Sequence, residues 1–132
     1  MSLTDALLDH AQQLRFEHLG AGAVAARKVF LMDSLAVGIS GSGAQVPLTA
    51  AVRASAASYG SGSAARAWVS GERLPAPSAA MVNGWQIHCQ EFDCVHMPAV
   101  VHPMAVSASA LIAAAEDKAN RGQGAVDGRA LS

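Results

Sequence analysis

The sequence is poor in charged and aromatic side chains. Only 14% of its 132 residues are charged, aromatic residues make up 5%, and the formal net charge is −1. Without a basic excess the chain has little to neutralise the phosphates of a nucleic acid or an acidic membrane, so neither partner is expected. Apolar runs such as residues 29–32 and 112–115 are far shorter than the roughly 20 residues that cross a bilayer.

Cysteine is also scarce. Cys89 and Cys94 are the only two, five positions apart, and two free thiols in a reducing compartment are the default interpretation, with a local disulfide left open. The residues after Met1 do not form a basic segment followed by an apolar one, as a secretory signal would. We therefore expect a cytoplasmic protein.

What the chain has in quantity is small apolar residues in helical patterns. Its hydrophobic fraction of 52% comes largely from alanine, which suits closely packed helices better than a sheet sandwich. The second predicted helix is apolar on nearly every side and is expected to be buried, and Gly38, Gly41 and Gly43 are expected to break it. Apolar spacing and the Gly and Pro positions predict helices over residues 2–19, 23–39, 47–58, 77–90 and 103–116, an extended piece over 67–70, and the start of another element over 128–132. We therefore predict one all-α domain, an irregular helical array.

One segment gathers most of the chemically reactive groups. Residues 83–103, NGWQIHCQEFDCVHMPAVVHP, hold three of the five histidines, both cysteines and two acidic residues. On the fourth predicted helix, Met81, Gly84, Trp85, His88 and Glu91 share a face, with His88 and Glu91 at its end. His102 directly precedes Pro103 at the start of the fifth helix. Asp93 and His96 lie in the loop between them. The layout brings carboxylates and imidazoles to one junction between helices, where a pocket can form.

Three interpretations of this segment remain open. A carboxylate and a histidine that face one substrate can perform acid–base catalysis, as proton abstraction beside a carbonyl requires. His88 and Glu91 also have the one-turn spacing of a metal-ligand pair, which His96 and His102 could complete. The third interpretation is that each group is a hydrogen-bonded polar residue at a helix end. The metal interpretation is the weakest, because no CxxC or HExxH pattern is present.

Other candidates are more simply explained as structural. Asp33 lies within the apolar second helix, where pairing with a neighbouring helix is favoured over a functional acid. The Gly-Ser-Gly runs at 41–43 and 60–62 follow no convincing strand, so they are not predicted to bind phosphate. Cys94 is two positions from His96 but is interpreted as a passive thiol, since adjacency in a loop does not guarantee a thiol–imidazole contact.

The stretch MVNGWQIHCQEFDCVHMPAVVHP resembles the signature of the 2-methylcitrate dehydratase family, also called MmgE/PrpD. That family shows an Asn-Gly pair, a histidine three residues before an acidic–aromatic–aspartate run, and a His-Pro pair that opens a helix of small residues. Glu91 stands where the family has aspartate, and Cys94 where it usually has another aspartate. The matching positions are Asn83-Gly84, His88, Glu91-Phe92-Asp93 and His102-Pro103.

The resemblance implies a lyase that acts on a small polycarboxylic acid by proton transfer, giving dehydration or a related decarboxylation or epimerisation. It also implies a homo-oligomer and neither a metal nor an organic cofactor. Family members are several times longer, so residues 1–132 resemble the N-terminal part of a larger helical domain and are expected to be inactive alone. The competing interpretation is a non-catalytic helical module that self-associates.

The resemblance and the helix–loop–helix layout together give a set of candidate site residues. Glu91 and His102 are predicted to be the catalytic acid–base groups, on opposite ends of the loop. His88, Asp93 and His96 are predicted to bind the substrate. The segment 83–103 contains no lysine or arginine, so cationic partners for a polycarboxylate are expected to come from elsewhere.

Overall fold

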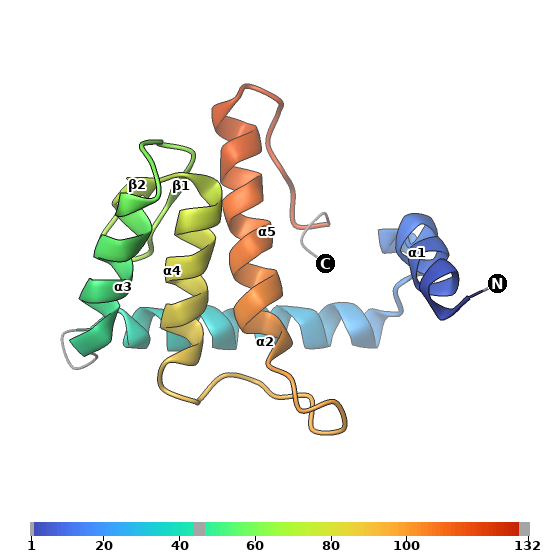
Figure 1. Ribbon diagram of the computed structural model, residues 1–132. Helices are drawn as coiled ribbons and strands as arrows, with labels where there is room; N and C mark the ends of the chain where they lie inside the picture. Colours follow the sequence, from blue (N-terminus) through green and yellow to red (C-terminus); the bar gives the residue numbers. More distant parts are fainter. Residues whose placement is uncertain (1, 44–46, 130–132) are drawn as a thin grey trace.

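The structure is a computed structural model that describes residues 2–43 and 47–129. These residues form five α-helices, one 3₁₀ turn and a two-stranded hairpin, so the all-α prediction is confirmed (Figure 1). In chain order the elements are α1 (Leu3–Gln13), the 3₁₀ turn (Phe16–His18), α2 (Ala21–Gly41), α3 (Pro47–Ser58), β1 (Ala65–Arg66), β2 (Arg73–Leu74), α4 (Ala76–His88) and α5 (Pro103–Asn120).

Helix α4 is the centre of the arrangement. It packs against α5, α2 and α3, while the long helix α2 runs across one end of this group and α1 stands apart (Figure 1). Polar side chains tie three of these helices together: the indole Nε1–H of Trp85 donates to the Thr49 hydroxyl at 3.1 Å, which donates to the carbonyl of Gly41 at 2.8 Å. Of the helices that the structure describes, none is long and apolar enough to span a membrane.

The core is built mainly from small side chains, which bring the helix backbones close together. Gly84 shows this at the α4–α5 contact, because a Cβ there would lie 2.9 Å from the carbonyl oxygen of Ala105. At Gly41 a Cβ would collide with the carbonyl oxygen of Gln86, across the α2–α4 contact. The main buried cluster consists of Ala56, Ala65, Ala67, Leu74, Ala79, Val82 and Ala113. Close packing of this kind explains how a chain with few aromatics forms a core.

Helix α2 departs from the prediction in both length and burial. It continues past Gly38, which was expected to break it, and ends at Gly41, two residues beyond the predicted end; both glycines permit close packing against α4. The expectation that α2 is buried is wrong, since Met32 is 68% exposed and Phe30 45%. Only Ser34, Gly38 and Gly41 are buried on α2, because α4 and α5 cover one side of the helix and leave the rest open.

The first and last helices have different bounds from those predicted. Helix α1 ends at Gln13 rather than at residue 19, and the guanidinium of Arg15 donates to the carbonyls of Gln12 and Leu14 there. Helix α5 continues to Asn120, four residues past the predicted end. Residues 128 and 129 lie in a turn, and the remainder of the element predicted over 128–132 falls outside the described residues.

The extended segment is also displaced from its predicted position. Strands β1 and β2 pair antiparallel, with Ala65 opposite Leu74, and the predicted residues 67–70 lie in the connection between them. Asn83 on α4 anchors this connection: its amide accepts from the backbone N–H of Trp68 and donates to the carbonyl of Arg66, both at 2.9 Å. The buried Asn83 of the Asn-Gly pair therefore has a structural role.

Candidate active site

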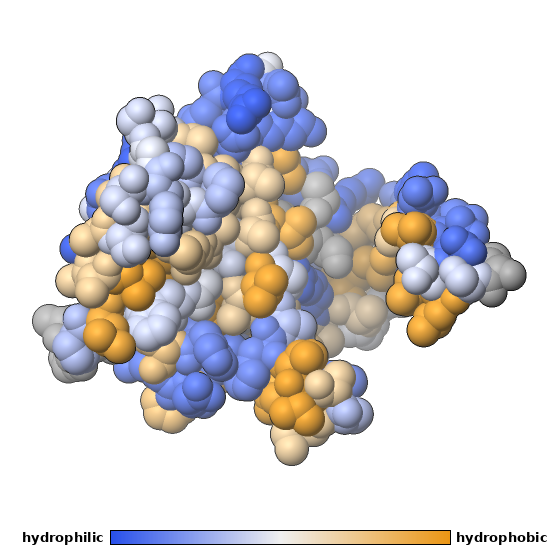
Figure 2. Space-filling view, in the orientation of Figure 1, coloured by the Kyte–Doolittle hydropathy of each residue, from blue (hydrophilic) through white to orange (hydrophobic). Residues whose placement is uncertain are grey.

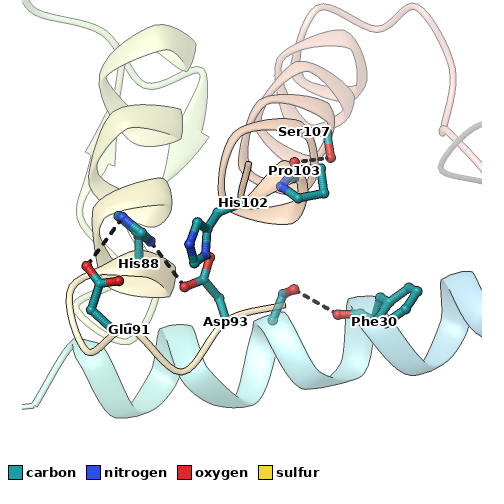
Figure 3. A network of polar contacts seen from close by, with 8 residues as sticks. Phe30, His88, Glu91, Asp93, His102, Pro103 and Ser107 are labelled. Carbon is teal, nitrogen blue, oxygen red and sulfur yellow. Dashed lines mark hydrogen bonds and ion pairs between the residues drawn. The ribbon is translucent and has the colours of Figure 1, made fainter. Parts of the chain in front are cut away.

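The reactive groups meet where α4 ends and α5 begins. The two helices run antiparallel, so the last residue of α4, His88, lies beside the residue that precedes α5, His102 (Figure 3). Pro103 occupies the first turn of α5, where its missing N–H costs no hydrogen bond, and so fixes the helix start directly after His102. The loop between the helices carries Glu91 and Asp93 into the same junction.

Asp93 lies at the centre of the cluster. Its side chain is fully buried, and its two oxygens face different histidines: Oδ1 is 3.1 Å from Nδ1 of His88, and Oδ2 is 3.2 Å from Nδ1 of His102. The two imidazole rings are 4.6 Å apart between centroids and meet edge to face, at 62°. One buried carboxylate therefore connects both rings.

Glu91 approaches the cluster from the solvent side. Its side chain is 74% exposed, and Oε1 lies 3.6 Å from Nε2 of His88, on the opposite side of the ring from Asp93. The backbone of Glu91 has a φ of +56°, and its N–H donates to the carbonyl of His88 at 2.9 Å. Residues other than glycine rarely adopt this left-handed conformation, and such strain is often found at functional sites.

The structure therefore brings together four of the five predicted site residues. One ligand-type atom from each of His88, Glu91 and His102 lies within 4.8 Å of the others, and Asp93 lies against both rings. His96 is placed elsewhere: it is exposed, its Nδ1 accepts from the N–H of Ala99 at 3.3 Å, and its backbone bridges to Val101. The catalytic and binding roles of these residues stay predictions.

A groove lies beside the cluster, and the sequence predicted only part of its lining. It has a volume of about 1100 Å³, and both His88 and His102 contribute to its lining. The spacing on α4 indicated Met81 and Trp85 as part of this face, and both line the groove. Tyr59, directly after α3, also lines the groove. The sequence did not indicate it, because the periodicity of one helix does not reveal which other helix packs beside it.

The remaining candidates do not join the cluster. Burial raises the pKa of the Cys94 thiol, and the nearby charges of Asp93 and Asp33 raise it further, so Cys94 stays protonated and is a poor nucleophile. Burial likewise raises the pKa of Cys89. Asp33 is exposed on α2 and takes part in none of the ion pairs described, so the expected pairing with a neighbouring helix is not seen.

The cluster is a poor fit for a transition metal. Zinc with ligand bonds of about 2.1 Å needs tetrahedral ligand atoms about 3.4 Å apart, whereas those of His88, Glu91 and His102 spread over as much as 4.8 Å. We expect purified, untagged protein to contain less than stoichiometric zinc or iron by elemental analysis. A stoichiometric metal that is lost in His88→Ala but kept in His10→Ala would contradict this.

The fold and the cluster define a helical domain with a histidine–carboxylate site at the junction of two antiparallel helices. The chain belongs to the MmgE/PrpD family, whose N-terminal domain matches residues 5–130. Over 116 residues, which make up 87% of this chain, it is 32% identical to cis-aconitate decarboxylase of Mus musculus. The chain spans about a quarter, 23%, of the length of that relative. No solved structure matches it.

Proposed function

We propose that this chain carries the acid–base groups of a lyase that acts on a small polycarboxylic acid. The observation that supports this most is the meeting of Glu91, His88 and His102 around the buried Asp93, inside the part of the chain that matches the family. The mouse relative is a decarboxylase of cis-aconitate, a small polycarboxylic acid. Glu91 and His102 are the residues that we assign to proton transfer.

The arrangement fits a reaction that moves a proton at a carbon beside a carboxylate. His102 has one ring nitrogen directed at Asp93, which leaves the other to take a proton from the substrate or deliver one to it. Glu91 is exposed and lies against Nε2 of His88, so this pair can hold the second proton that dehydration requires for the leaving hydroxyl. His88 also serves as a substrate-binding group, whereas His96 is outside the proposed site.

The cluster has few fixed positive charges for a polycarboxylate. Residues 83–103 contain no lysine or arginine, and Glu91 and Asp93 add negative charge. Because the chain spans only 23% of the relative's length, we propose that the 132 residues alone have no detectable turnover. The residues that neutralise the substrate carboxylates would then come from outside this chain.

The test is an assay of the complete gene product and of the 132-residue chain against a panel of di- and tricarboxylic acids that includes cis-aconitate and 2-methylcitrate. Turnover by the complete product alone supports the proposal. A complete product that ends with this chain, folds, and neither turns over nor binds any acid of the panel would instead support a non-catalytic helical module. Turnover by the 132 residues would contradict the proposed need for further cationic groups.

We also propose that the chain self-associates, because large apolar side chains remain at its surface. Figure 2 shows apolar surface on α1 and on the loop between α4 and α5, where Leu3 and Met97 are 78% and 72% exposed. Val106 on α5 and Met32 on α2 are similarly open. Exposed apolar area of this kind is usually covered by a partner.

We expect light scattering to give a dimer or larger species at micromolar concentration. Met32→Gln should shift the equilibrium toward monomer, since it removes an exposed apolar side chain from α2. Ser40→Gln, at an exposed polar position of the same helix, is the matched control and should leave the molecular mass unchanged. A stable, folded monomer of the unsubstituted chain would refute self-association.

A further inference from the structure

We propose that Asp93 is a positioning residue shared by two histidines, and that it fixes the proton on Nδ1 of both His88 and His102. The two relevant distances are 3.1 Å and 3.2 Å, one to each carboxylate oxygen. The side chain of Asp93 is fully buried, so it acts on the substrate only through the rings that it holds.

The contact with His102 is defined by the burial of its two atoms and the distance between them. Oδ2 of Asp93 and Nδ1 of His102 are both buried and lie 3.2 Å apart, and neither forms an aligned hydrogen bond with any residue that the structure describes. An ionised carboxylate can only accept hydrogen bonds, so a proton on Nδ1 is the arrangement in which the two atoms attract each other. A bare Nδ1 would leave two buried acceptors facing each other at 3.2 Å, which is costly.

The same argument applies to His88. Its Nδ1 lies 3.1 Å from Oδ1 of Asp93, so this nitrogen must donate. Its Nε2 is directed at Glu91, 3.6 Å away. Both histidines thus keep Nδ1 for the buried carboxylate, and Nε2 is left as the nitrogen that exchanges protons. This catalytic consequence rests on the proposed function, whereas the proton positions do not.

Two other histidines provide a contrast within the same chain. Nδ1 of His18 accepts the backbone N–H of Arg15, and Nδ1 of His96 accepts that of Ala99, each at 3.3 Å. When neutral, these two rings must therefore carry their proton on Nε2. The structure thus predicts opposite tautomers for His18 and His96 on one side and His88 and His102 on the other.

Asp93→Asn should give the two histidines beside it different tautomers. An asparagine side chain has one acceptor oxygen and one donor nitrogen, so it can accept from only one ring. The other ring then faces an N–H and must accept at Nδ1, which moves its proton to Nε2. Asp93→Ala removes the acceptor for both rings, so that either nitrogen of each ring can then carry the proton.

The experiment is a long-range ¹H–¹⁵N correlation spectrum of the ¹⁵N-labelled chain, which identifies the protonated nitrogen of each imidazole. At about pH 8.5, above the usual titration range of histidine, we expect Nδ1 to be protonated in His88 and His102 and bare in His18 and His96. In Asp93→Asn, one of the first two should change and the latter two should not.

The wild-type spectrum alone can overturn the inference, even if the variants fail to fold. A bare Nδ1 on His88 or His102 would contradict it, as would an Asp93→Asn protein in which both rings keep Nδ1–H. The outcome is independent of the proposed function. If the tautomers are as expected but the protein turns over no polycarboxylate, the inference about Asp93 stands and the proposed function is contradicted. If the protein turns over a polycarboxylate but the tautomers are the opposite ones, the proposed function stands and the inference is contradicted.

Discussion

His102→Ala is expected to lower the turnover of the complete gene product by about 100-fold or more, the usual size of an acid–base contribution. The substitution removes the ring whose Nδ1 lies against Asp93 and which belongs to the cluster with His88 and Glu91. Steady-state kinetics with the acid that the protein turns over fastest would measure the effect. We expect the loss in kcat rather than in KM, because the ring acts when the proton moves.

A matched histidine substitution separates this role from a general effect of losing an imidazole. His10 lies in the last turn of α1, which stands apart from the cluster (Figure 1). His10→Ala should therefore retain the turnover of the unsubstituted protein. Near-normal turnover by His102→Ala would remove His102 from the catalytic residues, and an equal loss in both variants would show that the assay reports folding instead.

Local sequence signals predicted the helices well where a proline marks the start. Pro47 and Pro103 begin α3 and α5 as expected, because proline at the first turn costs no hydrogen bond. Glycine was less informative. Gly38 was interpreted as a helix breaker but lies inside α2, and Gly41, the last residue of α2, lets the backbone approach Gln86 of α4. The pattern of one helix does not show which face another helix will cover, so the exposure of α2 could not be predicted either.

The sequence was sufficient to predict which residues gather at the site, but not how their side chains are arranged there. The positions of His88 at the end of one helix and His102 before the next were sufficient to bring them together. The loop conformation was not readable, because Glu91 and Val100 adopt positive φ values that their residue types do not favour. The burial of Asp93 between two rings and the separation of His96 from the cluster both depend on that loop.

Replacing Glu91 by glycine is expected to raise the stability of the fold and to lower its activity, because the backbone of Glu91 is strained. Its φ of +56° costs a residue with a Cβ about 1 kcal/mol or more, whereas glycine adopts this conformation freely. Glu91→Gly should raise the free energy of unfolding by up to about 1 kcal/mol, since the side chain is 74% exposed and buries little. It should also lower turnover by about 100-fold, because it removes the carboxylate beside His88.

Two further variants complete the test, with urea unfolding and steady-state turnover measured on each. Val69 also has a positive φ, +67°, and lies between β1 and β2, so Val69→Gly should stabilise the fold similarly and leave turnover unchanged. Glu91→Gln keeps the strained backbone and the shape but cannot hold the proton, so it should lose activity without gaining stability. If Glu91→Gly unfolds more easily than the unsubstituted protein, the side chain supports the fold. If it keeps its turnover, the strain at Glu91 does not serve catalysis.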